Sequence, residues 1–396
     1  MKKPVETFVI GLVALSHAVS HFFQIMLAPL FPLIKEDLGV SYAALGFAVA
    51  LFYALSAVCQ PIAGFIVDRF GGRAVLVLGM GGLALGMVVA GSAGSYPVLV
   101  AGAAIAGLGN SVFHPADFSI LNSRVGADRL GYAYSAHGVA GAIGYAASPM
   151  LSGVVAVAFG WHAALFAAAG VGALMMLLLL SNWSLLAAAL PAERKPARPA
   201  DLRAIFTAPV VMCFLYFVVY ACGLSGVQSF SVAAMTAQYD VAKQLAFTAL
   251  TTYMVGSAIG IFAGGFIATR TARHDLVAAT GLFLGACSVF LIAAHAVPAA
   301  SLPLFLGLAG ACIGATGPSR DLIVRASTPV GATGRVYGFV YSGFDVGGFV
   351  MPVFYGWLMD HSLPQGVFYV SAVFTALAMA TVLNLPGRRQ PAIQRT

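Results

Sequence analysis

Long apolar runs separated by short polar breaks dominate the pattern of the chain. A helix of roughly 20 such residues crosses a hydrocarbon core. The runs are continuously apolar rather than alternating, which favours helices over barrel strands. No cleavage site follows the first run, so we interpret it as a retained span. The predicted spans cover residues 7–33, 42–66, 74–93, 97–123, 131–158, 161–188, 205–233, 244–268, 275–297, 299–325, 335–359 and 364–385.

One connection between runs is both polar and rich in proline. The segment PAERKPARPADLR, residues 191–203, divides the spans six and six. We therefore expect an N-terminal six-helix bundle over residues 1–190, a cytoplasmic linker over 191–204 and a C-terminal six-helix bundle over 205–396.

An internal repeat relates the two halves. A shift of 203 positions places six Gly, Pro and Tyr residues on identical residues: Gly107 on Gly310, Pro115 on Pro318, Gly131 on Gly334, Tyr134 on Tyr337, Pro149 on Pro352 and Gly153 on Gly356. Six spans per half keep equivalent helices parallel, as in two-bundle transporters with a substrate site between the halves. The predicted fold is an all-α membrane protein with twelve transmembrane helices in two pseudo-symmetric six-helix bundles.

Composition and charge agree with a membrane location. The chain is 60% hydrophobic and 8% charged, whereas soluble domains carry about 25% charged residues. With both termini in the cytoplasm, 17 of the 20 Lys and Arg residues fall on cytoplasmic segments, leaving Lys35, Lys243 and Arg320. The positive-inside rule therefore predicts cytoplasmic termini, in a bacterial inner membrane. Anionic lipid accounts for the net charge of +7, so no nucleic-acid partner is expected.

Two motifs resemble the major facilitator superfamily. GFIVDRFGGR, from Gly64 through Asp68 and Arg69 to Arg73, is similar to the cytoplasmic loop motif of that family. The resemblance implies that it latches one transport state, through hydrogen bonds and helix-terminus charge at Asp68. The simpler alternative is a plain positively charged loop. The corresponding segment of the second half, GGFIATRTARHD, lacks the acidic residue.

The motif GYAASPMLSG in the fifth span resembles the Gly/Pro motif of the superfamily's antiporters, through Gly144, Pro149 and Gly153. Phe-His-Pro at residues 113–115 is similar to the fosmidomycin-resistance type of exporter. One departure is Ala103, where many drug antiporters of the superfamily carry an arginine.

Polar residues in the first span are candidates for the transport pathway. His17, His21 and Gln24 share one helix face, and polar groups at this depth face the bundle interior or water. A cavity-lining role in substrate recognition or proton coupling is the favoured interpretation. Interhelical hydrogen bonding is the alternative. A metal site is not expected, because two histidines with no nearby carboxylate are an incomplete ligand set.

The fourth and tenth spans carry opposite charges at equivalent depth. His114 and Asp117 lie on one face that continues to Arg124, and the repeat places Arg320 near the position of Asp117. Buried charges need a partner or water. We expect either a charge pair across the halves that forms when the cytoplasmic side closes, or neutralisation inside each bundle. Asp321 is one turn from Arg325 and able to pair with it.

Two further ionisable residues lie in predicted spans. Asp345 is in the middle of the eleventh span and His137 is in the fifth. We rank Asp345 with Asp117 as candidate proton carriers, and structural hydrogen bonding is the alternative. The five cysteines are spaced without a pattern and predict no disulfide or metal framework.

Together these features predict a secondary active transporter, a proton-coupled exporter of a small organic molecule that acts by alternating access. Uptake of an organic anion or metal chelate is the alternative within the same fold. A membrane enzyme using His114 and Asp117 as acid and base is disfavoured, because no nucleophile or metal site accompanies them. No cofactor is expected. The expected partners are the substrate, protons and membrane lipid, and the chain is expected to be a monomer.

Overall fold

The computed structural model describes residues 3–126, 129–187, 207–328 and 333–383. These residues form helices joined by short turns, with no strand among them. The prediction of an all-helical membrane protein is therefore confirmed. The predicted linker over 191–204 lies outside the described residues.

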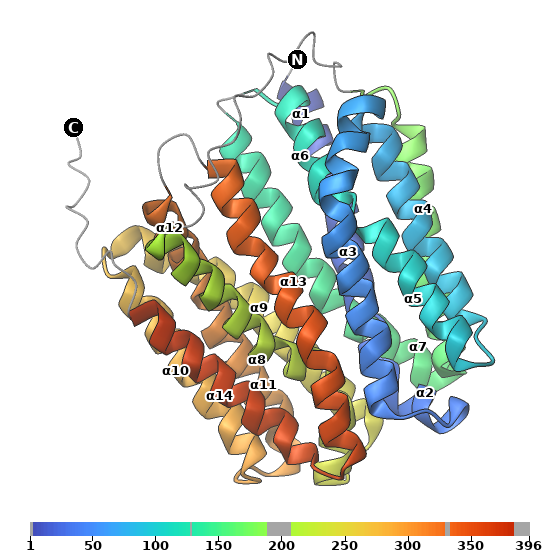
Figure 1. Ribbon diagram of the computed structural model, residues 1–396, viewed down its shortest axis with the longest axis vertical. Helices are drawn as coiled ribbons and strands as arrows, with labels where there is room; N and C mark the ends of the chain where they lie inside the picture. Colours follow the sequence, from blue (N-terminus) through green and yellow to red (C-terminus); the bar gives the residue numbers. More distant parts are fainter. Residues whose placement is uncertain (1–2, 127–128, 188–206, 329–332, 384–396) are drawn as a thin grey trace. The chain divides into compact units, whose positions relative to one another are not determined.

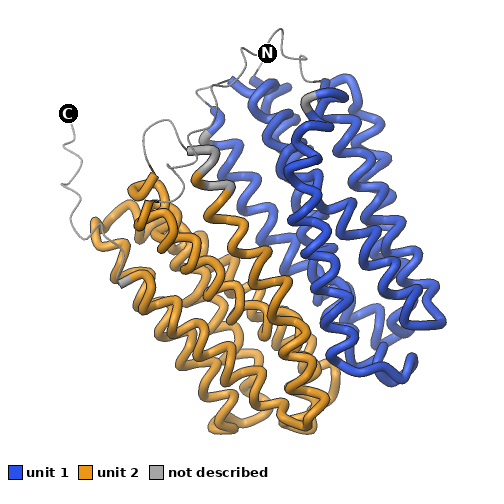
Figure 2. The backbone as a smooth tube through the Cα atoms, in the orientation of Figure 1, with its two compact units in different colours: residues 1–197 blue, residues 198–396 orange. Residues whose placement is uncertain are grey.

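The chain separates into two compact units, Met1–Ala197 and Arg198–Thr396, shown in different colours in Figure 2. Unit 1 contains α1 (Lys3–Gln24), η1 (Ala28–Leu30), α2 (Phe31–Leu38), α3 (Tyr42–Phe70), α4 (Gly72–Gly91), α5 (Tyr96–Asn110), α6 (Phe113–Arg124) and α7 (Leu130–Ser181). Unit 2 contains α8 (Ala208–Tyr239), α9 (Lys243–Arg270), α10 (His274–Ala293), η3 (Ala299–Ser301), α11 (Leu302–Ala315), α12 (Gly317–Ser327), α13 (Thr333–Asp360) and α14 (Pro364–Leu383).

Glycines with positive φ end several helices where the sequence predicts breaks. Gly39 ends α2 at φ 63°, and Gly71 separates α3 from α4 at φ 83°. Gly160, at φ 84°, bends α7 between two helical legs. L-residues with a Cβ rarely adopt these angles. The fifth and sixth predicted spans are therefore the two legs of α7.

Prolines explain why two other predicted spans are each divided into two helices. Pro115 follows the break between α5 and α6, and Pro318 follows the break between α11 and α12. Proline provides no backbone N–H and its ring crowds the carbonyl four residues earlier, which interrupts the helix at that point. Equivalent spans of the two units are thus broken at equivalent places.

Ten helical segments of the described chain are long and apolar enough to span a membrane. One of them, Tyr132–Ser181, is α7 with its bend at Gly160. The expected total of twelve spans stays a prediction.

Helix packing within each unit follows the same scheme. In unit 1, α5 packs against α3 and α4, and α7 packs against α1 (Figure 1). In unit 2, α11 packs against α9 and α10, and α13 packs against α8. Glycines permit the close contacts: a Cβ at Gly107 would lie 2.5 Å from the Phe52 carbonyl oxygen, and one at Gly310 would collide with the Tyr253 carbonyl oxygen. The internal repeat therefore corresponds to repeated packing.

Candidate functional site

Three helices of unit 1 bring an acid and two histidines together in the interior. His17 comes from α1, Asp117 from α6 and His137 from α7. The Asp117 Oδ2 atom lies 3.0 Å from His137 Nε2 and 3.2 Å from His17 Nδ1. The two imidazole rings stack with their centroids 3.5 Å apart. The three residues are 0–4% exposed, so water does not screen their interactions.

Two more histidines adjoin this group. The His21 ring lies 4.3 Å from the His17 ring and 4.5 Å from that of Tyr145, centroid to centroid. His114, three residues before Asp117, lies 5.3 Å from the His17 ring, and its Nδ1 is 3.3 Å from Gln60 Oε1. We call His17, His21, His114, Asp117 and His137 the histidine cluster.

The sequence selected all five members but did not show that they meet. It placed them on three separate spans, and no local spacing predicts how those spans pack. The statement that His17 and His21 have no nearby carboxylate is wrong, because α6 places Asp117 beside them. The histidine cluster therefore contains a mixed nitrogen and oxygen ligand set.

A layer of polar side chains next to the cluster surrounds Gln24. Gln24 accepts a hydrogen bond from the Tyr145 hydroxyl at 2.6 Å and donates to Asn110 Oδ1 at 3.4 Å. Asn110 in turn donates to the Ser56 hydroxyl at 2.8 Å. Of these residues, only Gln24 was predicted from the sequence, since single Ser, Asn and Tyr residues in apolar spans are common.

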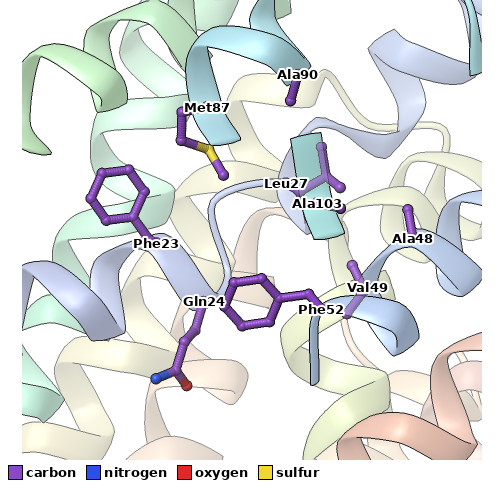
Figure 3. Close-up of a pocket in the computed structure, with 9 residues that line it drawn as sticks. All are labelled: Phe23, Gln24, Leu27, Ala48, Val49, Phe52, Met87, Ala90 and Ala103. Atoms are coloured by element: carbon purple, nitrogen blue, oxygen red, sulfur yellow. The ribbon is translucent and has the colours of Figure 1, made fainter. Parts of the chain in front are cut away.

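A small cavity adjoins Gln24 on its apolar side. Its volume is about 20 Å³, which is enough for about one water molecule. Eight apolar residues and Gln24 line it, and the Gln24 amide points away from Phe23 and Met87 (Figure 3). Ala103, the position at which many drug antiporters carry an arginine, is one of the apolar lining residues. This region of unit 1 is therefore a small apolar space with a polar border.

Unit 2 has a different arrangement on α12. Arg320 Nε donates to Asp321 Oδ1 at 2.9 Å, and the Tyr341 hydroxyl donates to the same oxygen at 2.8 Å. The guanidinium lies 4.9 Å from the Phe217 ring centroid and 5.7 Å from that of Phe344. Cation–π contacts of this kind stabilise a charge away from water. The aromatic residues around Arg320 were not predicted.

The charges on α6 and α12 each have partners within their own unit. Asp117 contacts two histidines of unit 1, and Arg320 contacts Asp321 of unit 2. A charge pair across the halves stays a prediction. Asp345 on α13 differs from both, since it has no hydrogen-bond or ion-pair partner among the residues that the structure describes.

The loop motif is described in part. Gly64 and Arg69 lie near the end of α3, and Arg73 is in the first turn of α4. Arg73 donates to the Trp183 carbonyl at 3.4 Å, and its guanidinium lies 4.5 Å from the Trp183 ring centroid. The side chain of Asp68 lies outside what the structure describes, so the predicted latch stays a prediction.

The antiporter-like motif lies on the first leg of α7. Gly144 packs against α1, where a Cβ would collide with the Ala18 carbonyl oxygen. Pro149 lies within the same helix leg, and Gly153 follows it by one turn. Ser148 and Ser152, which replace two glycines of the family motif, are buried. The motif thus forms part of a close contact between α7 and α1.

Comparison with known proteins identifies the family. The model of the Major Facilitator Superfamily matches residues 13–250 and 219–395. The chain belongs to the major facilitator superfamily. The predicted resemblance is confirmed, and the chain is an integral membrane transporter of small molecules.

Relatives of this superfamily member include a resistance protein and other transporters. The fosmidomycin resistance protein of Escherichia coli (strain K12) is 25% identical over 96% of this chain and 93% of its own length. An MFS-type transporter of Bacillus subtilis (strain 168), YfnC, is 24% identical over 78% of this chain and 77% of its own. A probable sulfoacetate transporter of Cupriavidus necator is 25% identical over 41% of this chain and 39% of its own.

Solved structures share the fold at low identity. A bacterial homologue of the human lysosomal transporter Spinster has a TM-score of 0.77 at 16% identity, covering 99% of this chain and 100% of its own. The nucleoside transporter NupG has a TM-score of 0.78 at 13% identity, covering 95% of this chain and 99% of its own. At these identities the likeness concerns the fold alone.

Proposed function

We propose that the chain exports a small organic molecule and is driven by the proton gradient of the bacterial inner membrane. The observation that supports export is the near full-length similarity to the fosmidomycin resistance protein of Escherichia coli. Alternating access by two helical bundles is the mechanism that this fold supports. We further propose that both termini are cytoplasmic and that the chain acts as a monomer in contact with membrane lipid.

Asp345 is the residue to which we assign the proton. An unpaired carboxylate inside a membrane span is costly unless it faces water or carries a proton. Asp345 lies in the middle of α13 and has no polar partner within the described part of the chain. Asp117, the other candidate, is engaged by His17 and His137. We therefore infer that Asp345 binds a proton in one transport state and releases it in the other.

Each unit offers its own candidate groups for substrate recognition. Gln24, Asn110 and Tyr145 offer neutral donors and acceptors beside an apolar cavity. In unit 2, Arg320 offers a guanidinium bordered by aromatic rings. These groups suit a small molecule with apolar and polar parts, and the chain carries it without a covalent change.

Uptake of an organic anion is the second candidate function. The observation in its favour is Arg320, since a guanidinium recognises carboxylate and sulfonate oxygens in a forked geometry. The partial similarity to a probable sulfoacetate transporter points the same way. Transport direction in oriented vesicles decides between the two functions.

The experiment measures flux in proteoliposomes with an imposed proton gradient. Candidate substrates come from a growth screen of a deletion strain against toxic compounds and carbon sources. Asp345→Asn is expected to abolish gradient-driven transport and to retain substrate exchange. Asp240→Asn is the control, because Asp240 is an exposed helix end with φ 51°, which Asn also tolerates. Full gradient-driven transport by Asp345→Asn would overturn the assignment of the proton.

A further inference from the structure

Buried polar atoms without partners mark the histidine cluster as incomplete. Asp117 Oδ1 and both ring nitrogens of His21 lack a hydrogen-bond partner among the described residues. His17 Nδ1 lies 3.2 Å from Asp117 Oδ2 but without hydrogen-bond geometry. An unsatisfied buried polar group destabilises the folded state, so several in one place call for a compensating ligand. The polar layer around Gln24 shows no such deficit at Gln24, Asn110 or Ser56.

The distances in the cluster match those between ligands of one metal ion. Ligand atoms of His17, Asp117 and His137 all lie within 4.8 Å of one another. Two of the separations are 3.0 Å and 3.2 Å. Zinc bonds of 2.0–2.1 Å in a tetrahedron place neighbouring ligand atoms about 3.3 Å apart. The spacing of these atoms therefore matches a small tetrahedral ion, and the two rings, whose planes are 21° apart, would turn to direct both nitrogens at it.

The kind of ligand selects the kind of ion. Two imidazoles and one carboxylate are typical of zinc and related transition-metal sites, whereas magnesium and calcium prefer all-oxygen ligands. The His17 and His137 rings stack at 3.5 Å, a distance at which two imidazolium cations would repel. Neutral imidazoles, in contrast, can each bind a dication through a ring nitrogen. His21 and His114 form an adjoining trio with His17 and can supply a fourth ligand.

The geometry points to a resident transition-metal site, of the Zn²⁺ class, formed by His17, Asp117 and His137 inside unit 1. The ion compensates the buried Asp117 carboxylate and ties α1, α6 and α7 together. This inference goes beyond the proposed function, because it concerns neither the transported molecule nor the proton at Asp345. It also differs from the expectation from sequence that no metal binds.

The experiment is a cobalt titration of the untagged, full-length, chelator-treated protein in detergent micelles. Tetrahedral Co²⁺ gives visible d–d absorption, and Zn²⁺ should displace it. We expect one Co²⁺ per chain for the unmodified protein. His137→Gln and Asp117→Asn should weaken binding at least tenfold, whereas His137→Cys should keep it, because a thiolate also binds these ions. Size-exclusion profiles identify the variants that remain folded.

The matched control is His162→Gln, a histidine of the same helix α7. Its nitrogens contact the Gly91 carbonyl and Asp37, away from the cluster, so this variant should bind Co²⁺ as the unmodified protein does. Absence of binding by the unmodified protein overturns the site, as does equal binding by folded His137→Gln. Gradient-driven accumulation of ⁶⁵Zn²⁺ in proteoliposomes would show that the ion is cargo and would overturn its assignment as resident.

Discussion

The two units of this transporter share a helical scaffold but carry different chemistry on equivalent helices. On α6 of unit 1, a buried carboxylate lies among imidazole rings, and the side chains of Asp117, His17 and His137 are shielded from water. On α12 of unit 2, a guanidinium lies among aromatic rings, next to an aspartate whose side chain is 42% exposed. Repetition of the sequence has therefore preserved the scaffold while the polar residues on it have diverged.

The glycines show which part of the scaffold cannot change. Gly144 in α7 and Gly347 in α13 are 203 positions apart and play the same part in the two units. A Cβ at Gly144 would collide with the Ala18 carbonyl oxygen, and one at Gly347 would lie 2.5 Å from the Ala221 Cβ. Contacts between backbones offer no flexible side chain that can move aside. The shared scaffold thus depends on positions without a side chain.

The largest expected effect comes from adding a methyl group at these close contacts between helices. Gly144→Ala and Gly347→Ala should each destabilise the protein by about 3 kcal/mol or more, since overpacking forces helices apart. Thermal denaturation followed by fluorescence-detected size exclusion measures the loss. Gly138→Ala, with nothing within 4 Å of the added carbon, is the control and should be neutral or stabilising. If either Gly144→Ala or Gly347→Ala left the melting temperature unchanged, the two glycines would not play equivalent parts in the two units.

Much of the scaffold was predictable because its signals are local. Continuous apolar runs marked the spans and Gly160 fell between two of them, whereas the breaks before Pro115 and Pro318 divide spans that we predicted as continuous. The site was less predictable. His17, Asp117 and His137 were selected one by one, but their meeting depends on how α1, α6 and α7 pack. The aromatic residues around Arg320 could not be singled out, because they are among 28 Phe and 14 Tyr residues of the chain that carry no local mark of contact.

The second largest effect is the loss of stability when the aspartate is removed from each polar site. It differs between the sites because the groups left without a partner differ in charge. Asp321→Ala leaves the Arg320 guanidinium, whose side chain is only 16% exposed, without its carboxylate partner. We expect a loss of about 2–3 kcal/mol, less than for a fully buried pair because solvent screens part of it. Asp117→Ala leaves neutral imidazoles short of an acceptor, which costs about 1–2 kcal/mol.

Thermal denaturation in the presence of a chelator tests whether Asp321→Ala loses more stability than Asp117→Ala. The chelator is needed because losing a bound metal would add to the effect of Asp117→Ala. Arg273 and Asp275 form an exposed pair in unit 2, so Asp275→Ala is the control and should change stability by less than 1 kcal/mol. If Asp117→Ala proves the more damaging change without metal, the histidine cluster holds charged rings and the contrast between the units is wrong.

The smallest effect concerns the loop motif, which only the first half retains. Asp68 precedes the α3–α4 turn, whereas the corresponding segment near the end of α9 has no acid equivalent to Asp68. A carboxylate near a helix N-terminus contributes about 0.3–1 kcal/mol. If Asp68 stabilises one transport state in this way, Asp68→Asn should slow turnover by about two- to fivefold and leave substrate binding unchanged. Arg270→Gln, at the end of α9, should leave both turnover and substrate binding unchanged.

Transport rates in proteoliposomes measure turnover, and equilibrium binding in detergent measures substrate affinity separately. A folded Asp68→Asn protein that binds no substrate would place Asp68 in substrate recognition, and an equal slowing by Arg270→Gln would show that both halves contribute a latch.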